Sequence, residues 1–397
     1  MILRAEIDDA CMNVPRLTEG EWARICELGD DVSRATSLPS SVYTSSEIYE
    51  IELEQIFYSK WLLICHSSQL KNPGDAWIQR IGNKSIVVVK QGEARFSAFY
   101  NVCRHRGTRL VKESCHLEIF QCPYHGWTYK LDGTLVGCPE MEGTSGFRKE
   151  DISLIRVRLE TWGGFIFVNL GQTSQSLISY LGDFASRFQK YHLEDLDWAG
   201  NIGRYSSMSN WKVYMENFSE CYHCGIVHPE TIGRYYRQHI PYNSKKIHGP
   251  YSMYYFDDRT DKGALKEHIP STYQDSVKSG DFSEDDMHMI YLPTLFPNTA
   301  MVICPAYVAT YHAWPDGLRR TQVSIEMFAP RSTPRNKVKK VMEDLDLINK
   351  QDINLVSAIQ EGLDCEVFQG GRFSTLEECV HGFERLYLES LKLPSSF

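Results

Sequence analysis

The spacing of apolar residues changes twice along the chain of 397 residues. Up to about residue 58 they recur at helical spacing, as at Ile48 and Ile51, behind a capping box expected at Thr44 and Glu47. Short apolar runs separated by Gly and Asn turns follow, and this pattern is typical of strands. We expect strands at 61–64, 76–81, 85–89, 94–100, 126–129, 135–136 and 164–169.

The remainder of the chain mixes both kinds of period. The expected elements are a helix at about 211–227, strands at 300–314 and 320–328, and a long helix at about 334–363. The sequence therefore predicts an α+β protein in three parts. These are a helical segment at 1–58 that packs on the last part, an all-β domain at 59–168, and a mixed domain at 169–397.

Composition and charge narrow the class of protein. Hydrophobic residues make up 42% and charged residues 23% of the chain, as in ordinary globular proteins. The formal net charge of −9 argues against a nucleic-acid-binding protein, which needs clustered positive charge. The longest uncharged stretch, 287–315, contains four prolines and does not predict a membrane-spanning helix. The acidic N-terminus lacks the pattern of a secretory or transit peptide, so we expect a cytoplasmic protein without membrane partners.

Two pairs of Cys and His lie within the expected all-β domain. Their pattern is Cys-x-His, sixteen residues, then Cys-x-x-His, with Gly107 and Gly126 placed where tight turns suit glycine. The four residues are Cys103, His105, Cys122 and His125. Three interpretations compete: chance clustering of buried residues, a structural zinc site, and a Rieske [2Fe–2S] cluster with cysteines on one iron and histidines on the other. The interleaved order favours the cluster, because zinc sites of this composition usually place both cysteines before both histidines.

A second group of candidate metal ligands follows in the expected helix at 211–227. Glu220 and His223 are three residues apart and would share a helix face. His223 and His228 are five apart, which is about 140° of rotation on an ideal helix. Both can bind one metal only if the helix ends or bulges between them, as Gly225 and Pro229 would allow.

A carboxylate would complete a site of two histidines and one carboxylate for non-haem Fe(II). Asp352 is the candidate, because it shares the long helix's expected apolar stripe with Ile348, Val356 and Ile359. A carboxylate on a buried face is costly unless it is paired or binds metal. The alternative is an ion pair between Asp352 and a buried Arg or Lys. Asp346 lies well off the stripe.

These motifs closely resemble those of Rieske non-haem iron oxygenase α subunits, over about residues 44–363. The resemblance rests on Cys103-x-His105-Arg-Gly107 with Cys122-Pro-x-His125-Gly126-Trp127, on Glu220-x-x-His223-x₄-His228-Pro229, and on Gln351-Asp352-x-x-Leu355-x₄-Gln360-x-Gly362-Leu363. Ser357 stands where a Glu is often found in that family. The resemblance implies an all-β Rieske domain and a helix-grip-like catalytic domain with an antiparallel sheet.

The resemblance also implies the cofactors and partners. A Rieske [2Fe–2S] cluster would be held by Cys103, His105, Cys122 and His125, and mononuclear Fe(II) by His223, His228 and Asp352. O₂ would be the co-substrate, and NAD(P)H electrons would arrive through a separate flavin- or ferredoxin-type reductase, since no Gly-rich dinucleotide motif is visible in this sequence. Members are typically homotrimers, in which an acidic residue bridges His125 of one subunit to His223 of the next, and Glu220 occupies that position.

The substrate is the least determined part of this interpretation. Glu at position 220 is closer to the choline, glycine betaine and carnitine monooxygenase branch, which hydroxylates or N-demethylates quaternary ammonium compounds. An aromatic cage for such a cation is a candidate at 235–256, through Tyr235, Tyr236, Tyr251, Tyr254, Tyr255 and Phe256. The alternatives are an aromatic-ring hydroxylating oxygenase and, in another class, a zinc-stabilised non-catalytic binding protein.

Overall fold

The computed structural model divides the chain into two compact units. One contains residues 58–198, and the other combines the described residues of 1–57 with those of 199–397. The structure describes residues 20, 21, 25, 28–172, 174–233, 240–242, 249–257, 283, 285–365 and 367–391. Residues 169–198, which the sequence assigns to the mixed domain, belong to the first unit. The expected domain boundaries stay a prediction.

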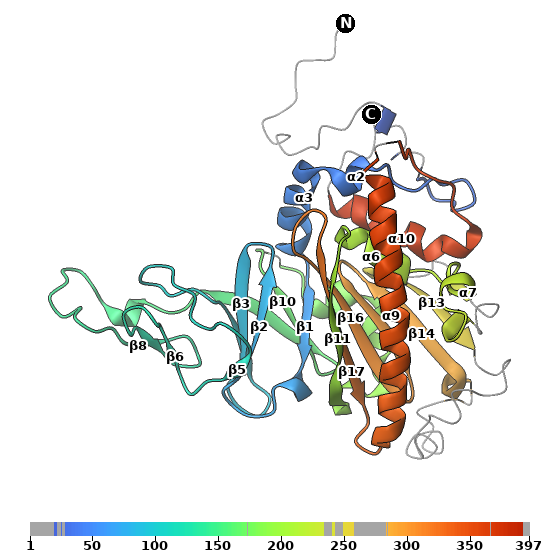
Figure 1. Cartoon of the computed structure of the whole chain (residues 1–397). Coiled ribbons are helices and arrows are strands. Elements are labelled where there is room, and N and C mark those ends of the chain that lie inside the picture. Colours follow the sequence, from blue (N-terminus) through green and yellow to red (C-terminus); the bar gives the residue numbers. More distant parts are fainter. Residues whose placement is uncertain are drawn as a thin grey trace, which may run out of the picture. The chain divides into compact units, whose positions relative to one another are not determined.

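The unit of residues 58–198 is built on β-sheets (Figure 1). Its larger sheet has seven strands in the order β1-β10-β9-β4-β3-β2-β5. Their bounds are β1 Leu62–His66, β2 Asp75–Ile81, β3 Lys84–Lys90, β4 Phe96–Tyr100, β5 Cys115–His116, β9 Arg156–Trp162 and β10 Phe165–Asn169. Helices α4 Leu177–Leu181 and α5 Asp183–Arg187 follow. This unit therefore matches the all-β character that its short apolar runs predict.

A smaller three-stranded sheet completes the unit in the order β6-β7-β8. Its strands are β6 Phe120–Gln121, β7 Thr128–Tyr129 and β8 Leu135–Gly137. A buried cluster that includes Val87, Phe99, Phe120 and Tyr129 packs beside both Cys103 and Cys122. The rings of Phe99 and Phe120 meet edge to face with centroids 6.2 Å apart. The two loops that carry the candidate cluster ligands are thus anchored on a hydrophobic core.

The other unit contains a sheet in the order β11-β17-β16-β15-β14-β13-β12. The pairs from β12–β13 to β16–β17 are antiparallel. The strands are β11 Asp197–Ser207, β12 Ile240–Tyr242, β13 Tyr251–Asp257, β14 Met289–Leu295, β15 Thr299–Cys304, β16 Tyr307–Pro315 and β17 Thr321–Ala329. This antiparallel sheet with helices on it agrees with the α+β class expected from the sequence.

Several helices belong to the same unit, and the long helix α9 runs along the sheet (Figure 1). The helices are α2 Ser41–Thr44, α3 Ser46–Glu52, η2 Leu53–Phe57, α6 Trp211–Phe218, α7 Cys224–Val227, α9 Arg335–Leu363 and α10 Glu378–Ser390. α6 packs against α9, β15 and β16, while α10 packs against β13. α9 begins and ends within one residue of the expected helix at 334–363.

Several local expectations are corrected. The single strand expected at 300–314 is two antiparallel strands, β15 and β16, joined by a turn. Ser45, not Thr44, caps α3, because its side chain accepts a hydrogen bond from the Ile48 amide at 3.3 Å. The single helix expected at 211–227 is two, α6 and α7, with a turn between them. The buried stripe of α9 consists of Leu345, Asn349, Val356, Gln360 and Leu363, whereas Ile359 is 42% exposed.

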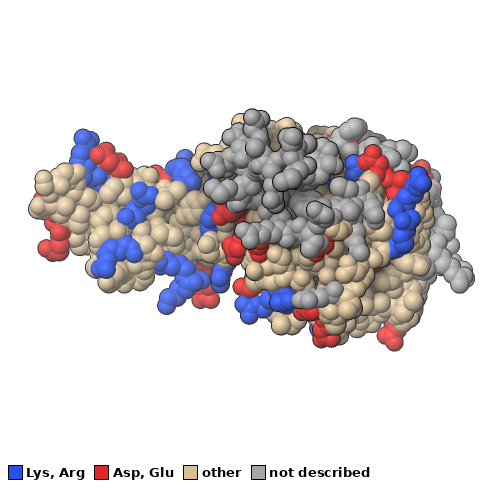
Figure 2. All heavy atoms as spheres, turned by 90° about the horizontal axis from the view of Figure 1, so that it is seen from above, with Lys and Arg blue, Asp and Glu red and all other residues tan. Residues whose placement is uncertain are grey.

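No helix within the described ranges is long and apolar enough to cross a membrane. Figure 2 shows both Lys and Arg and Asp and Glu among the described residues on the face it presents.

A buried polar network joins α3, α6 and α10 within the unit that contains residues 199–397. Lys212 Nζ lies 2.5 Å from Glu52 Oε1, and both side chains are fully buried. Glu52 also accepts hydrogen bonds from Trp211 and Tyr387, each at 2.7 Å. One lysine faces more than one acid here, because Glu216 and Glu384 lie within the same network. A charged Lys212 can balance one carboxylate, so the others favour the protonated form.

This network should make the folded state less stable as pH rises. Burial raises the pKa of Glu216 to about 7, against the opposing effects of its hydrogen bond from Tyr43 and the charge of Lys212; burial also raises the pKa of Glu384. A folded-state pKa above the unfolded value of 4.5 means that the stabilisation is complete below pH 4.5 and is lost as pH rises through about 7. We expect the free energy of unfolding to fall by about 1–3 kcal/mol between pH 5 and pH 7.5.

Glu216→Gln should flatten this dependence, because glutamine keeps an acceptor for the Tyr43 hydroxyl but does not titrate. Urea unfolding at pH 5, 6 and 7.5, followed by tryptophan fluorescence, measures it. Glu343→Gln, at an exposed glutamate of α9, serves as the control and should keep the wild-type slope. An identical slope in Glu216→Gln and wild type would remove Glu216 from the pH response.

Candidate metal centres

The first candidate centre is formed by two loops that close in the same way. In each loop the cysteine amide donates to a carbonyl five residues later, and a glycine amide donates back to the cysteine carbonyl. The bonds are Cys103 N to Thr108 O at 2.8 Å, Gly107 N to Cys103 O at 3.1 Å, Cys122 N to Trp127 O at 2.8 Å, and Gly126 N to Cys122 O at 3.1 Å. Gly107 and Gly126 have φ of 73° and 70°, a region that favours glycine and confirms the expected turns.

The loops bury the two sulfur atoms and expose the two imidazoles. Cys103 and Cys122 are 2% and 3% exposed, whereas His105 and His125 are exposed. The two imidazole centroids lie 4.8 Å apart. Trp127 stacks on His105 with an interplanar angle of 5°, so this ring is held in place. The structure therefore brings together all four residues that the sequence predicts as cluster ligands, in a pattern suited to a Rieske cluster with histidines at the outer edge.

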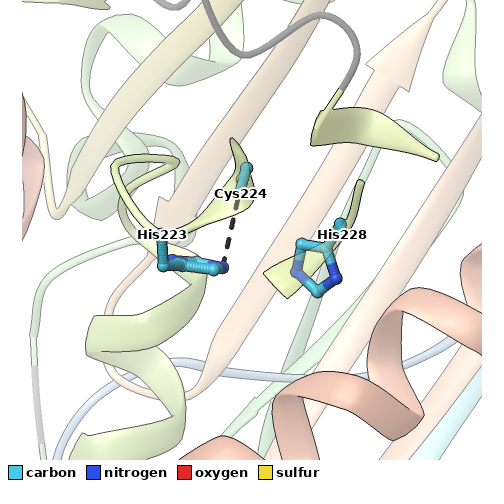
Figure 3. Close-up of side chains that lie close together, drawn as sticks. All are labelled: His223, Cys224 and His228. Atoms are coloured by element: carbon cyan, nitrogen blue, oxygen red, sulfur yellow. Dashed lines mark hydrogen bonds between the residues drawn. The ribbon is translucent and has the colours of Figure 1, made fainter. Parts of the chain in front are cut away.

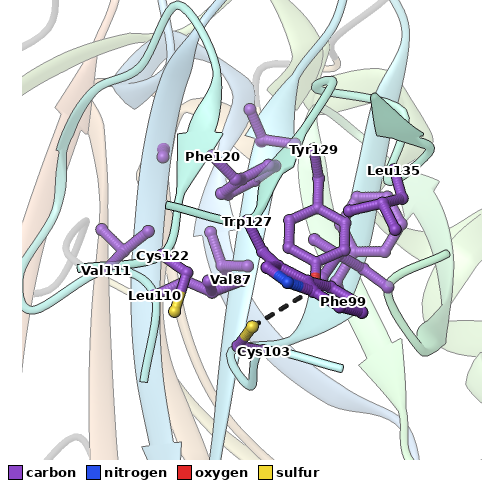
Figure 4. Close-up of a cluster of buried hydrophobic side chains, with 13 residues drawn as sticks. Val87, Phe99, Cys103, Leu110, Val111, Phe120, Cys122, Trp127, Tyr129 and Leu135 are labelled. Carbon is purple, nitrogen blue, oxygen red and sulfur yellow. Dashed lines mark hydrogen bonds between the residues drawn. The ribbon is translucent and has the colours of Figure 1, made fainter. Parts of the chain in front are cut away.

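The sulfur environment fits a group that carries negative charge. In Figure 4 the sulfurs of Cys103 and Cys122 lie at the edge of the hydrophobic cluster, with a hydrogen bond between Cys103 and Tyr129. The Tyr129 hydroxyl accepts from the Arg104 amide at 3.0 Å, so its own proton is free to point at Cys103 Sγ, 3.3 Å away. Burial opposes ionisation of Cys122, but hydrogen bonds from backbone amides, including that of Tyr124, lower the pKa of its thiol.

The second candidate centre depends on a break in the helix. α6 ends at Phe218, and Glu220 lies in the turn before α7 rather than on a shared helix face as expected. The Glu220 carboxylate accepts hydrogen bonds from the amides of Tyr222 and His223, which hold it in the turn. Its Oε1 lies 2.5 Å from His223 Nδ1. His223 precedes α7 and His228 follows it, so that one helical turn brings their rings to centroids 5.3 Å apart (Figure 3).

Asp352 lies on α9, and its carboxylate is close to both histidines. Its Oδ1 lies 3.0 Å from His228 Nε2 and 3.5 Å from His223 Nε2, although no hydrogen bond of good geometry forms. Three donors that each lie about 2.1 Å from one metal ion at right angles would be about 3 Å apart. Both Nδ1 atoms are engaged elsewhere, with Glu220 and Gln351, so both Nε2 atoms face Asp352. His223 Nε2 also lies 3.5 Å from the Asn217 amide nitrogen, a long contact that a metal ion would replace. The donor set of two imidazoles and one carboxylate suits non-haem Fe(II) with open positions.

The charge at this site favours a bound cation. Burial opposes protonation of His223, but the adjacent carboxylates of Asp352 and Glu220 outweigh it and raise its pKa to about 9. Burial likewise opposes ionisation of Asp352, yet the two histidines lower the pKa of its carboxyl. Two buried carboxylates beside two imidazoles carry more negative charge than neutral histidines can balance. A divalent metal ion would supply the missing positive charge.

Cys224 also lies near these rings, and sequence reasoning did not single it out. The donor atoms of His223, Cys224 and His228 lie within 4.8 Å of one another. The Cys224 sulfur is bonded to Cys221 in a disulfide, with Cα atoms 4.9 Å apart. A disulfide sulfur is a poor ligand compared with a thiolate. Asp352 therefore fits the third position better than Cys224 does.

A cavity that is partly open to solvent lies at the His223–His228–Asp352 group. It is lined by Tyr214, Asn217, Phe218, Glu220, His223, Cys224, His228, Ile232, Tyr254, Leu292, Val302, Tyr311, Leu345, Ile348 and Asp352. The rings of Phe218 and Tyr311 lie 5.0 Å apart on this wall. The wall therefore combines aromatic faces with aliphatic side chains, and the carboxylates and imidazoles lie together within it.

The aromatic residues that line the cavity differ from those of the cage expected from the sequence. Of the six aromatic residues proposed from the sequence, Tyr254 lines the cavity, whereas Tyr235 and Tyr236 lie outside the described residues. Three further aromatic residues from other elements join Tyr254: Tyr214, Phe218 and Tyr311. Tyr311 lies in the uncharged stretch 287–315, so that stretch does contribute to the cavity wall. No local sequence pattern marks these three, because the fold brings them together from α6 and β16.

Comparison with known proteins places this architecture in a family. The family described as the ring hydroxylating alpha subunit (catalytic domain) matches residues 187–392, and the Rieske [2Fe-2S] domain matches residues 60–153. The chain belongs to this family of Rieske oxygenase α subunits. It is accordingly an oxidoreductase, the oxygenase component of a Rieske oxygenase system, and it depends on a separate reductase for electrons. The family uses a Rieske cluster, mononuclear iron and O₂.

Individual relatives extend over most of the chain. The carnitine monooxygenase oxygenase subunit of Acinetobacter baumannii is 28% identical over 353 residues, with 86% of this chain and 89% of that protein covered. The chloroplastic choline monooxygenase of Arabidopsis thaliana is 26% identical, with 91% and 84% covered. The crystal structure of a quaternary ammonium Rieske monooxygenase with its substrate gamma-butyrobetaine has a TM-score of 0.75 and 25% identity, with 96% and 100% covered.

The Tyr129 hydroxyl should raise the reduction potential of a cluster held by the loops of Cys103 and Cys122. Tyr129→Phe removes the hydroxyl that faces Cys103 Sγ, and a hydrogen bond stabilises the more negative, reduced cluster more than the oxidised one. A loss of about 1 kcal/mol for one electron lowers the reduction potential on the order of 40 mV. Redox titration followed by EPR measures this. Tyr100→Phe, on β4, is the control and should keep the wild-type potential. An unchanged potential in Tyr129→Phe would contradict the assignment of Cys103 as a ligand.

Proposed function

We propose that this protein hydroxylates or oxidatively N-demethylates a small quaternary ammonium compound, with the assigned residues as follows. Cys103, His105, Cys122 and His125 hold the Rieske cluster. His223, His228 and Asp352 hold mononuclear Fe(II). The observation that carries the second assignment is the convergence of the two histidine Nε2 atoms on Asp352 Oδ1, at 3.0 and 3.5 Å.

The overall reaction needs two electrons, two protons and O₂: the substrate C–H becomes C–OH, the second oxygen atom leaves as water, and NAD(P)H is oxidised through the reductase. When bound, the iron supplies the activation of O₂ at its open positions. The protein residues hold the two imidazoles in one tautomer and place the substrate in the cavity beside them. Hydroxylation of a methyl group on nitrogen gives a carbinolamine, which collapses to formaldehyde and the demethylated amine. A cytoplasmic location, where NAD(P)H is available, is part of this proposal.

Glu220 is proposed as the bridge for electrons between subunits of a homotrimer. Its carboxylate is held by amides of the turn and by His223 Nδ1, and its side chain is 12% exposed, so it reaches the rim of the site. Each carboxylate oxygen can accept more than one hydrogen bond. His125 is exposed at its loop, where a neighbouring subunit's Glu220 could accept a bond from it. Electrons would then pass from His125 through Glu220 to His223.

The cavity wall supports a cationic substrate. Phe218, Tyr254 and Tyr311 line the cavity, and aromatic rings attract a quaternary ammonium group by cation–π interaction. Glu220 and Asp352 add negative charge within the same cavity. The relatives named above act on carnitine and choline, and the related crystal structure contains gamma-butyrobetaine. An aromatic-ring substrate is the alternative, because the same wall would also bind an apolar ring.

A substrate screen separates these two functions. Choline, carnitine, glycine betaine and gamma-butyrobetaine would be compared with benzoate-type aromatic acids, for reductase-dependent NADH oxidation coupled to product. We expect coupled turnover with at least one ammonium compound, and coupled turnover with aromatic acids alone would establish the alternative.

The contribution of the aromatic wall to cation binding is tested separately. Calorimetry compares the binding of choline with that of its uncharged analogue 3,3-dimethylbutan-1-ol.

The wild type should bind choline more tightly than the neutral analogue, by about 3–30-fold, since a cation–π contact contributes about 0.5–2 kcal/mol. Tyr311→Leu should remove most of this preference. Tyr255→Leu is a matched control, because Tyr255 lies on β13 against Tyr291 and does not line the cavity. An equal preference in wild type and Tyr311→Leu would exclude Tyr311 from cation recognition.

The electron route has its own test. Glu220→Gln should retain about three iron ions per chain and yet lower NADH-driven turnover by at least about 100-fold, because an amide cannot accept from both histidines as a carboxylate does. H₂O₂ supplies an oxygen atom together with two electrons, so peroxide-driven product formation should persist in this variant. Glu54→Gln, at an exposed glutamate of η2, is the control. Loss of the peroxide-driven reaction as well would mean that Glu220 supports the iron site and not the route.

A further inference from the structure

The His228 ring is held between two consecutive residues of α9. Its Nδ1 lies 2.7 Å from Gln351 Oε1, and its Nε2 lies 3.0 Å from Asp352 Oδ1. His228 is 1% exposed, so water does not compete for these atoms. A single turn of α9 therefore supplies both the carboxylate that faces the metal side of the ring and the amide that faces its other side.

The chemistry of the amide determines which nitrogen of His228 carries the proton. The Gln351 oxygen can only accept a hydrogen bond, so Nδ1 must be the donor. The neutral imidazole then has its lone pair on Nε2, on the side of Asp352 and His223. The opposite tautomer would leave Nδ1 and Oε1 as two facing acceptors in a buried place, which is unfavourable.

The two histidines of this site differ in the charge of their partners. His223 Nδ1 faces the Glu220 carboxylate, whereas His228 Nδ1 faces a neutral amide. Glu220 and Asp352 together carry two negative charges, which match one divalent ion. Glu220 shows that a carboxylate can also accept from a ligand histidine, so a glutamate at position 351 would keep the acceptor for Nδ1. An amide at this position orients the ring without adding charge.

We propose that Gln351 is a positioning residue that fixes the tautomer and orientation of His228 for metal binding. The inference rests on the iron site of the proposed function. An acceptor opposite the metal side of a ligand histidine strengthens metal binding, and its loss typically weakens affinity by about 10–100-fold. Gln351 would act only through His228 and would not contact the metal.

The experiment uses the full-length protein with its Rieske cluster assembled. Wild type is compared with Gln351→Met, which is similar in length but lacks the oxygen acceptor, and with Gln351→Glu, which retains it. Asn354→Leu, at an exposed position of the same helix, is the control. Two quantities are measured: the rate at which Fe(II) is lost to a chelator, and the EPR spectrum of the Fe(II) site with nitric oxide as the probe. The cluster's visible spectrum and circular dichroism report folding.

We expect Gln351→Met to lose mononuclear iron about 10–100 times faster than wild type and to show an altered nitric oxide spectrum, with the cluster spectrum unchanged. Gln351→Glu should retain iron within about threefold of wild type, because the acceptor remains. Wild-type release and spectrum in Gln351→Met would overturn the proposal. Equal loss in both variants would also overturn it, since the acceptor would then not be the cause.

Two further outcomes keep the inference separate from the proposed function. A wild-type protein that binds no Fe(II) beyond its cluster would refute the iron site itself. If Gln351→Met does not fold, Gln351→Glu still decides, because rapid iron loss from that folded variant would contradict a role based on the acceptor oxygen.

Discussion

Two carboxylates held beside two imidazoles in a largely apolar cavity are the constraint on which the catalytic unit depends. Glu220 and Asp352 come from different elements, and burial of both without a compensating cation is costly. The raised pKa of His223 and the lowered pKa of Asp352 show how strongly this arrangement favours positive charge. The break between α6 and α7, the long helix α9 and the antiparallel sheet can each be understood as what brings these charges together.

The two candidate centres both contain histidines, but they differ in how far those histidines are exposed to solvent. In the Rieske loops the sulfur atoms are buried and the histidines exposed, so that the cluster edge is accessible to a redox partner. At the second centre His228 is buried and the cavity wall is aromatic and aliphatic. One arrangement favours exchange of electrons at a surface, and the other places the candidate metal ligands in a mostly apolar cavity that is only partly open to solvent.

The sequence predicted the residues that the structure brings together better than it predicted the fold. Spacing and turn glycines marked Cys103, His105, Cys122 and His125, and a carboxylate on a helical stripe marked Asp352. The strands β5, β6, β9, β11, β12, β13 and β14 were missed. β11 is Gly-rich and lies at the sheet edge, and β14 contains Pro293 within the sheet. The aromatic wall was predicted only at Tyr254, since its other members meet through tertiary packing and not through a local pattern.

The adjacency of Gln351 and Asp352 on α9 has a consequence for changes of length in this helix. A residue inserted or deleted N-terminal to them, within the helix, would rotate both by about 100° relative to the preceding turns. Both side chains that face His228 would then be displaced together. A change of length before residue 351 should therefore disturb the site more than a single substitution on the exposed face of α9.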